Sequence, residues 1–62
     1  IKVYAADHTI VIENVDNRQA EIFKIDGSKI FDEIISYKDR ICVETGIYIV
    51  RIDGKSFKVT VR

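Results

Sequence analysis

Few residues in this 62-residue chain have side chains that take part in catalysis. The single histidine, His8, stands between Asp7 and Thr9. An aspartate can orient an imidazole, but neighbours in an extended chain point to opposite sides. The single cysteine, Cys42, needs a positive and accessible setting to form a reactive thiolate. We therefore expect His8 to be a solvated turn residue and Cys42 to be a half-buried structural residue.

Two further patterns carry acidic groups. Asp32 and Glu33 are adjacent carboxylates, but catalytic pairs converge across a cleft, whereas strand neighbours face apart. Asp26-Gly27 and Asp53-Gly54 resemble parts of metal or phosphate loops, yet Asp-Gly is also the common signal of a type I′ hairpin turn. We read them as surface charges and structural turns. We expect no catalytic residue, no cofactor and no metal, and we predict that the chain is not an enzyme.

The composition excludes several classes of protein. Ten Lys and Arg balance ten Asp and Glu, and zero net charge argues against nucleic-acid binding and against a polybasic membrane anchor. Cations beside aromatic residues, as at Phe23-Lys24, therefore indicate core packing rather than base stacking. A single Cys excludes an internal disulfide. No apolar run approaches the roughly 18 residues that a membrane span needs, so we expect no direct membrane insertion.

The identity of the apolar residues predicts an all-β domain. Ile, Val and Thr make up 22 of 62 residues, and there is no Leu and no Met. β-Branched side chains favour strands over helices. The length allows one small domain. Because the chain begins at Ile1, we expect it to be a fragment of a longer protein.

Seven short runs with strand-like composition are separated by turn signals. They cover residues 1–4, 9–13, 18–26, 29–35, 40–44, 47–52 and 56–62. The sixth run is apolar on both faces, which is typical of a central strand. Within the fourth run, residues 34–37 could instead begin a helical turn. We predict a seven-stranded antiparallel β-sandwich.

The last third of the chain resembles a known family. Its sequence GIYIVRIDGKSFKVTVR, residues 46–62, is similar to the C-terminal end of the sorting domains on cargo of the Bacteroidetes type IX secretion system. That end combines a Gly-x-Tyr strand, a short Gly-Lys hairpin and a terminal basic strand. Upstream, AEIFKIDGSKI and TIVIENVDN resemble the family's hairpin and second strand. The resemblance covers about 55 residues, although the family usually has Leu in several core positions and this chain has none.

The resemblance implies an immunoglobulin-like sandwich and a role in protein transport. Residues 1–62 would form a single C-terminal domain that directs an upstream cargo domain of the same chain across the outer membrane. The implied partners are an outer-membrane translocon and a sortase-like peptidase that cleaves upstream of the domain. The implied location is the cell surface or the extracellular medium, reached through the periplasm.

We predict that the terminal hairpin is recognised by the translocon. The proposed recognition residues are Gly46, Tyr48, Val50, Lys55, Lys58, Val59, Val61 and Arg62. We expect Gly46 to provide a positive φ or a close backbone approach, and the Tyr48 hydroxyl to need a hydrogen-bond partner. Lys55, Lys58 and Arg62 form a basic group whose other interpretation is a solvated face that keeps an edge from pairing.

Two alternatives stay open at this stage. The domain could be a permanently retained β-sandwich module of a cell-surface adhesin or glycan-binding protein. The isolated chain could also form a strand-exchanged homodimer, because its last strand is expected to be a free edge.

Overall fold

The computed structural model describes residues 1–62 and contains seven β-strands and no helix. The strands are β1 (Lys2–Ala6), β2 (Thr9–Glu13), β3 (Arg18–Lys24), β4 (Lys29–Ile35), β5 (Asp39–Cys42), β6 (Gly46–Ile52) and β7 (Lys55–Val61). All seven predicted runs are therefore strands, and β2 and β4 have the predicted bounds. The residues considered for a helical turn instead end β4 and begin the following loop. No helix of the structure could cross a membrane.

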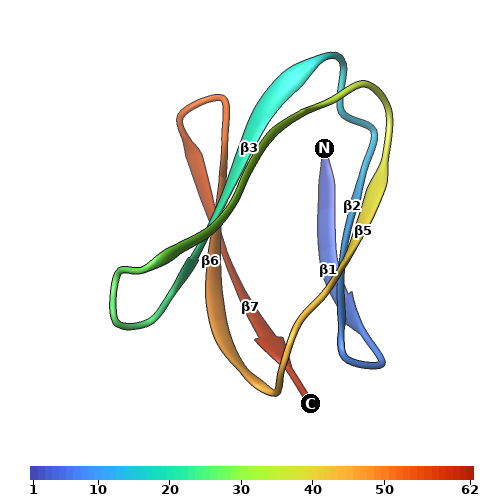
Figure 1. Ribbon diagram of the computed structural model, residues 1–62. Helices are drawn as coiled ribbons and strands as arrows, with labels where there is room; N and C mark the ends of the chain where they lie inside the picture. The colour runs from blue at the N-terminus through green and yellow to red at the C-terminus, as the bar shows by residue number, and fades with distance from the viewer.

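The strands form two antiparallel sheets that face each other (Figure 1). One sheet has the order β1-β2-β5, and the other has the order β4-β3-β6-β7. The central position predicted for the sixth run is confirmed, because β6 pairs with β3 on one side and β7 on the other. The two chain termini lie at opposite ends of the structure (Figure 1).

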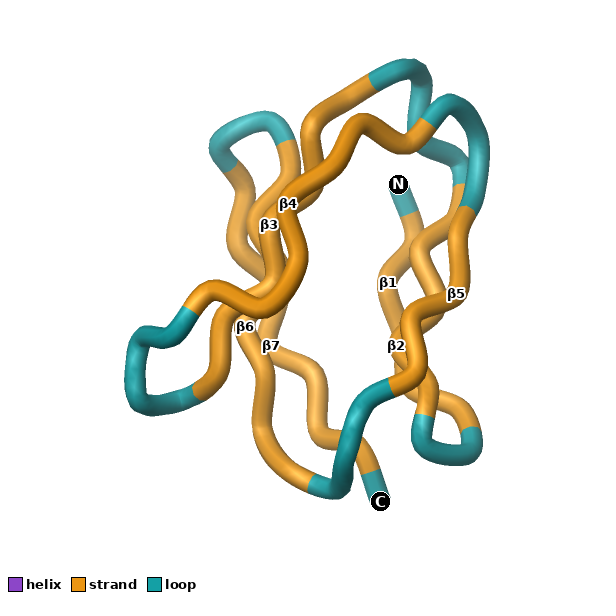
Figure 2. The backbone as a smooth tube through the Cα atoms, viewed as in Figure 1, coloured by secondary structure: helices purple, strands orange, loops and turns teal.

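Three hairpin turns join neighbouring strands, and three connections cross between the sheets (Figure 2). The β2–β3 and β4–β5 connections cross at the same end and hydrogen-bond to each other. The Val15 amide donates to the Tyr37 carbonyl at 2.9 Å, and the Asn17 amide donates to the Ser36 carbonyl at 3.3 Å. These bonds satisfy backbone groups where the chain leaves each sheet.

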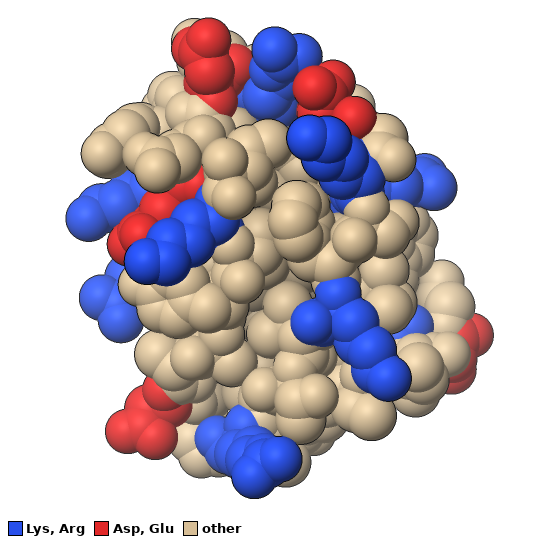
Figure 3. Space-filling model, turned by 180° about the vertical axis from the view of Figure 1, so that it is seen from behind, with Lys and Arg blue, Asp and Glu red and all other residues tan.

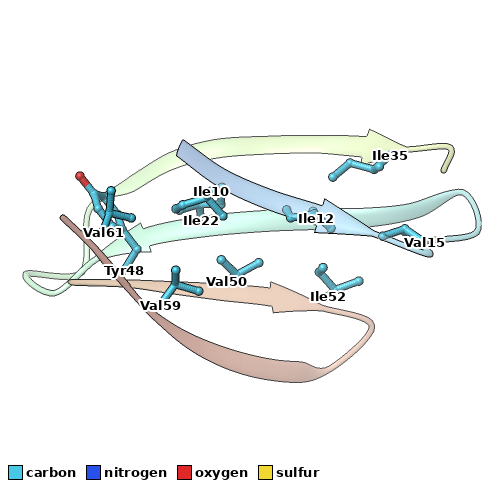
Figure 4. Packing of buried hydrophobic residues seen from close by; sticks show 11 residues of the cluster. Ile10, Ile12, Val15, Ile22, Ile35, Tyr48, Val50, Ile52, Val59 and Val61 are labelled. Carbon is cyan, nitrogen blue, oxygen red and sulfur yellow. The ribbon is translucent and has the colours of Figure 1, made fainter. Parts of the chain in front are cut away.

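One hydrophobic cluster fills the space between the sheets (Figure 4). Its largest fully buried side chains are Ile10, Ile12, Ile22, Ile52, Val50 and Val61. They come from both sheets, as strand alternation requires when one face of each sheet is buried. Every buried residue is hydrophobic, and no buried side-chain nitrogen or oxygen lacks a hydrogen-bond partner. Apolar burial is therefore the main contribution of the core to stability, and Tyr48 is its one member with a polar side-chain atom.

The two Asp-Gly sequences form different turns. Asp53 and Gly54 have φ values of 53° and 78°, which matches the predicted type I′ turn. At the other site only Gly27 has a positive φ, at 95°, and its amide donates to the Lys24 carbonyl at 2.9 Å. This is a three-residue loop with glycine in the left-handed position, so the type I′ expectation was wrong there.

Candidate functional site

The residues proposed for recognition fall into a buried group and an exposed group. The buried members lie on β6 and β7, where their side chains face the core (Figure 4); they are Tyr48, Val50, Val59 and Val61. Each is at most 5% exposed. In the folded domain these four side chains are buried and maintain the shape of the hairpin. Only their exposed neighbours can contact a binding partner directly.

Tyr48 and Gly46 lock the beginning of β6. The Tyr48 hydroxyl donates to the Glu44 carbonyl oxygen at 2.7 Å, so the hydroxyl has a hydrogen-bond partner, as expected. Gly46 has a positive φ of 159°, whereas a Cβ placed on it would make only an ordinary van der Waals contact with the Tyr48 ring, at 3.7 Å from Cε1. The hydrogen bond holds the β5–β6 connection against β6, the strand that pairs with β7.

The exposed members are Lys55, Lys58 and Arg62, all on or beside β7. Lys58 pairs across the ladder with Ile49, on the outer face of the four-stranded sheet. Arg62 has the same strand parity as Lys58, whereas Lys55 has the parity of the core-facing residues. None of the three has a side-chain carboxylate within 4.0 Å. The cations that form ion pairs in the structure are Arg18, Lys29 and Arg51.

Charge is unevenly distributed along the chain although its sum is zero. Residues 45–62 contain four Lys and Arg but a single acid, Asp53, and residues 54–62 contain none. Asp53 is itself paired with Arg18 at 3.2 Å. Figure 3 shows cations and acids scattered over a largely uncharged face, without an extended basic field. The β6–β7 hairpin is therefore a local cationic region in a neutral domain.

A network of ion pairs lies on the same outer face of this sheet, nearer to β4. The Lys29 ammonium lies 2.7 Å from Asp32 and 3.2 Å from Glu21, and Gln19 donates to Asp32. Hydrogen bonds from Lys29 and then Gln19 lower the pKa of Asp32. The bonds to Asp32 and then Glu21 raise the pKa of Lys29. Arg51 adds to this network through Glu21 at 3.4 Å.

A shallow polar depression of about 280 Å³ lies beside this network. Its lining consists of Arg18, Gln19, Glu21, Arg51, Asp53 and Gly54. The two carboxylates in it are each paired with an arginine, and the lining includes no Ser, Cys or His. The depression thus presents neutralised ion pairs rather than a nucleophile and a base.

The other residues considered for chemistry are separate. His8 is exposed in the β1–β2 turn with a φ of 49°, as predicted. Cys42 is exposed, so the half-buried position expected for it was wrong; it ends β5, on the face away from the core. Asp32 and Glu33 pair with Glu21 and Ala20, respectively, which places them on opposite faces. No group of three His, Cys, Asp or Glu could hold a metal ion.

The sequence predicted the basic group of the last hairpin but not the network of charges on the outer face. The network depends on strand register, which brings Glu21 beside both Asp32 and Arg51. The basic group could be predicted because residues 54–62 contain no acidic residue.

Comparison with known proteins places the chain in a family. No curated protein matches the sequence, and no solved structure matches it. One family model matches residues 1–61, which is nearly the whole chain. The chain therefore belongs to the family described as Domain of unknown function (DUF6383).

Proposed function

We propose that this chain is a non-catalytic C-terminal sorting domain that directs a larger cargo across the outer membrane by the type IX secretion system. The observation that carries the proposal is the composition of the β6–β7 hairpin. The residues that most resemble the sorting family are concentrated here, and they alternate between buried side chains and exposed cations without acidic partners. Such an arrangement is suited to being recognised.

We propose further that the fold is an immunoglobulin-like sandwich. The pairings β2–β5 and β3–β6 link strands that are distant in sequence, as Greek-key connections do. The Tyr48 hydroxyl bonded to the Glu44 carbonyl resembles the tyrosine corner of immunoglobulin-like domains, in which a Tyr near the start of the sixth strand bonds the backbone a few residues upstream. Tyr48 is also the tyrosine of the Gly-x-Tyr motif in the family resemblance.

In this proposal the partners are proteins. The translocon of the outer membrane contacts the hairpin, and the sortase-like peptidase cuts upstream of the domain. The cargo precedes the domain in the same chain and travels through the periplasm to the cell surface or the medium.

A transplant tests the proposal. Residues 1–62, preceded by a short native linker, are fused to the C-terminus of a periplasmic fluorescent reporter. The fusion is expressed in a type IX-competent Bacteroidetes strain and in a strain that lacks the translocon. We expect signal at the surface or in the medium only in the competent strain.

Periplasmic retention of intact fusion in both strains would contradict the proposal. It would favour a permanently retained module of a surface protein instead. Deleting residues 58–62 is a poor complement, because the deletion removes Val59 and Val61 from the core. Substituting Lys58 and Arg62 changes the exposed surface and keeps the core.

A further inference from the structure

The four edge strands of the two sheets differ in how well they resist pairing with another chain. Natural edges are protected by short length or by bulges. β1 and β5 have five and four residues. β4 has seven residues, but its register with β3 shifts between Ile22 and Phe23, which leaves Ile30 as the extra residue of a bulge. β7 also has seven residues, and its register with β6 is unbroken from Lys55 to Val61.

The free edge of β7 has backbone groups without partners. In a two-residue hairpin the residues flanking the turn form a hydrogen-bonded pair, and such pairs recur at every second residue. The pairs of β7 that face β6 are therefore those of Lys55, Phe57, Val59 and Val61. Ser56, Lys58 and Thr60 direct their amides and carbonyls away from β6. β1 packs near β7, but it hydrogen-bonds only to β2.

The side chains beside this edge are cationic or apolar. Lys58 and Arg62 share the outer face and are ~13 Å apart along the strand, with Thr60 between them. Their cross-strand neighbours include Ile49, which is half-buried, and Ile47, which is 38% exposed and faces Thr60. A strand added to β7 would thus find two unpaired cations spaced four residues apart beside exposed apolar surface.

We propose that β7 binds an extended acidic segment of another protein by strand addition, with carboxylates four residues apart facing Lys58 and Arg62. This inference rests on the proposed function, since it names the chemistry of the partner at the same hairpin. Main-chain hydrogen bonds would provide affinity, and the two cations would determine which residues of the added strand lie opposite β7.

The observations favour an acidic protein strand over two other occupants. In a second copy of this chain, pairing β7 with β7 would bring Lys55, Lys58 and Arg62 close to like charges. An anionic lipid surface would attract the cations but offers no row of main-chain donors and acceptors that matches the outward amides and carbonyls of Ser56, Lys58 and Thr60.

A binding experiment with the 62-residue chain tests the inference. The probe is a short synthetic peptide of alternating Thr and Val that carries two Glu residues four positions apart. We expect amide NMR shifts concentrated on β7. Binding should weaken by about tenfold or more when Lys58→Gln and Arg62→Gln are combined, which corresponds to roughly 1.4 kcal/mol. The matched control combines Lys24→Gln with Lys38→Gln, two exposed lysines without ion pairs, and should bind like the parent chain.

A proline variant isolates the backbone contribution. Thr60→Pro removes an outward amide and keeps the ladder to β6, and proline is tolerated at edge positions of this kind. We expect this variant to fold and to lose peptide binding. Shifts confined to β4 or β5, equal binding by the two charge pairs, or binding of anionic vesicles that the peptide does not compete away would overturn the inference. If Thr60→Pro does not fold, the comparison of the Lys58 and Arg62 double variant with the Lys24 and Lys38 double variant tests the inference by itself.

The outcome is separable from that of the export experiment. Peptide binding at β7 without reporter export would leave this inference standing and remove the sorting role. Reporter export that survives Thr60→Pro would keep the sorting role and remove strand addition at β7.

Discussion

The two outer strands of the four-stranded sheet, β4 and β7, have equal length but differ in regularity and in the pairing of their charges. β4 is bulged at Ile30, and its Lys29 and Asp32 are tied into a network with Glu21. β7 is regular, and its two lysines have no acidic partner. The same sheet therefore has one edge that is bulged and internally neutralised, and one edge that is regular and has no hydrogen-bonded neighbour, although β1 packs near it.

This difference suggests how a small neutral domain can present a specific surface. A net charge of zero does not prevent a local cationic strand when the acids are placed elsewhere. The lysines of β7 discourage pairing with an identical strand and remain compatible with an acidic one. Charge placement, rather than total charge, distinguishes the two edges.

The largest expected effect comes from the core that supports both edges. Ile22 is fully buried and pairs with Phe31 on β4 and Val50 on β6. Ile22→Ala should lower the free energy of unfolding by about 2–5 kcal/mol, because it leaves a cavity. Urea unfolding measures the change. The control Ile34→Ala, at a side chain 71% exposed on β4, should change stability by less than about 0.5 kcal/mol. Equal losses in the two variants would contradict the single shared core.

A smaller effect should be specific to the β7 side. Tyr48→Phe removes the hydrogen bond to the Glu44 carbonyl and keeps the ring in the core. We expect a loss of about 1–2 kcal/mol in the free energy of unfolding. Tyr4→Phe is the matched control, because its hydroxyl donates to Glu13 on an exposed face. If both variants lose the same stability, Tyr48 does not lock the hairpin.

The β4 side should respond to acid. Hydrogen bonds lower the pKa of Asp32 below its ordinary value of 3.8, so its stabilising contribution is present above pH 3.8 and is lost as the pH falls through the lowered value. Asp32→Asn should therefore reduce the acid-induced loss of stability below pH 3.8. Thermal unfolding at a series of pH values measures this. Asp16→Asn, at an exposed aspartate without an ion pair, should leave the acid limb unchanged. Identical acid limbs for parent and Asp32→Asn would show that the network contributes nothing.

The smallest expected effect is on stability at the β7 edge itself. Lys58→Gln combined with Arg62→Gln should change the free energy of unfolding by less than about 0.5 kcal/mol, since both side chains are exposed and unpaired. Chemical denaturation measures the change. A substantial loss would assign these cations to the fold and remove them from recognition.

Much of the fold was predictable from local pattern. β2 and β4 have their predicted bounds because alternating β-branched residues end at clear turn signals. The central place of β6 followed from its apolar residues on both faces. β1 extends through Ala6, past its predicted end, because alanine carries little local signal in either direction.

The site was less predictable because it depends on register and edges. The alternation of β7 indicated which side chains face out, but not that β7 has the only long, unbulged edge. Neither the bulge at Ile30 nor the three-residue turn at Gly27 followed from the local pattern, which had predicted a regular hairpin with a type I′ turn. The contacts of Lys29 and Arg51 with Glu21 join strands that no local pattern pairs.

The most direct test of the account is reporter export by charge-matched variants. Fusions carry the parent chain, the pair Lys58→Gln with Arg62→Gln, or the pair Lys24→Gln with Lys38→Gln, each in the type IX-competent strain. The account predicts that only the Lys58 and Arg62 pair leaves folded reporter fusion in the periplasm. Equal export of all three fusions would contradict the claim that the open cationic edge of β7 is the recognised surface.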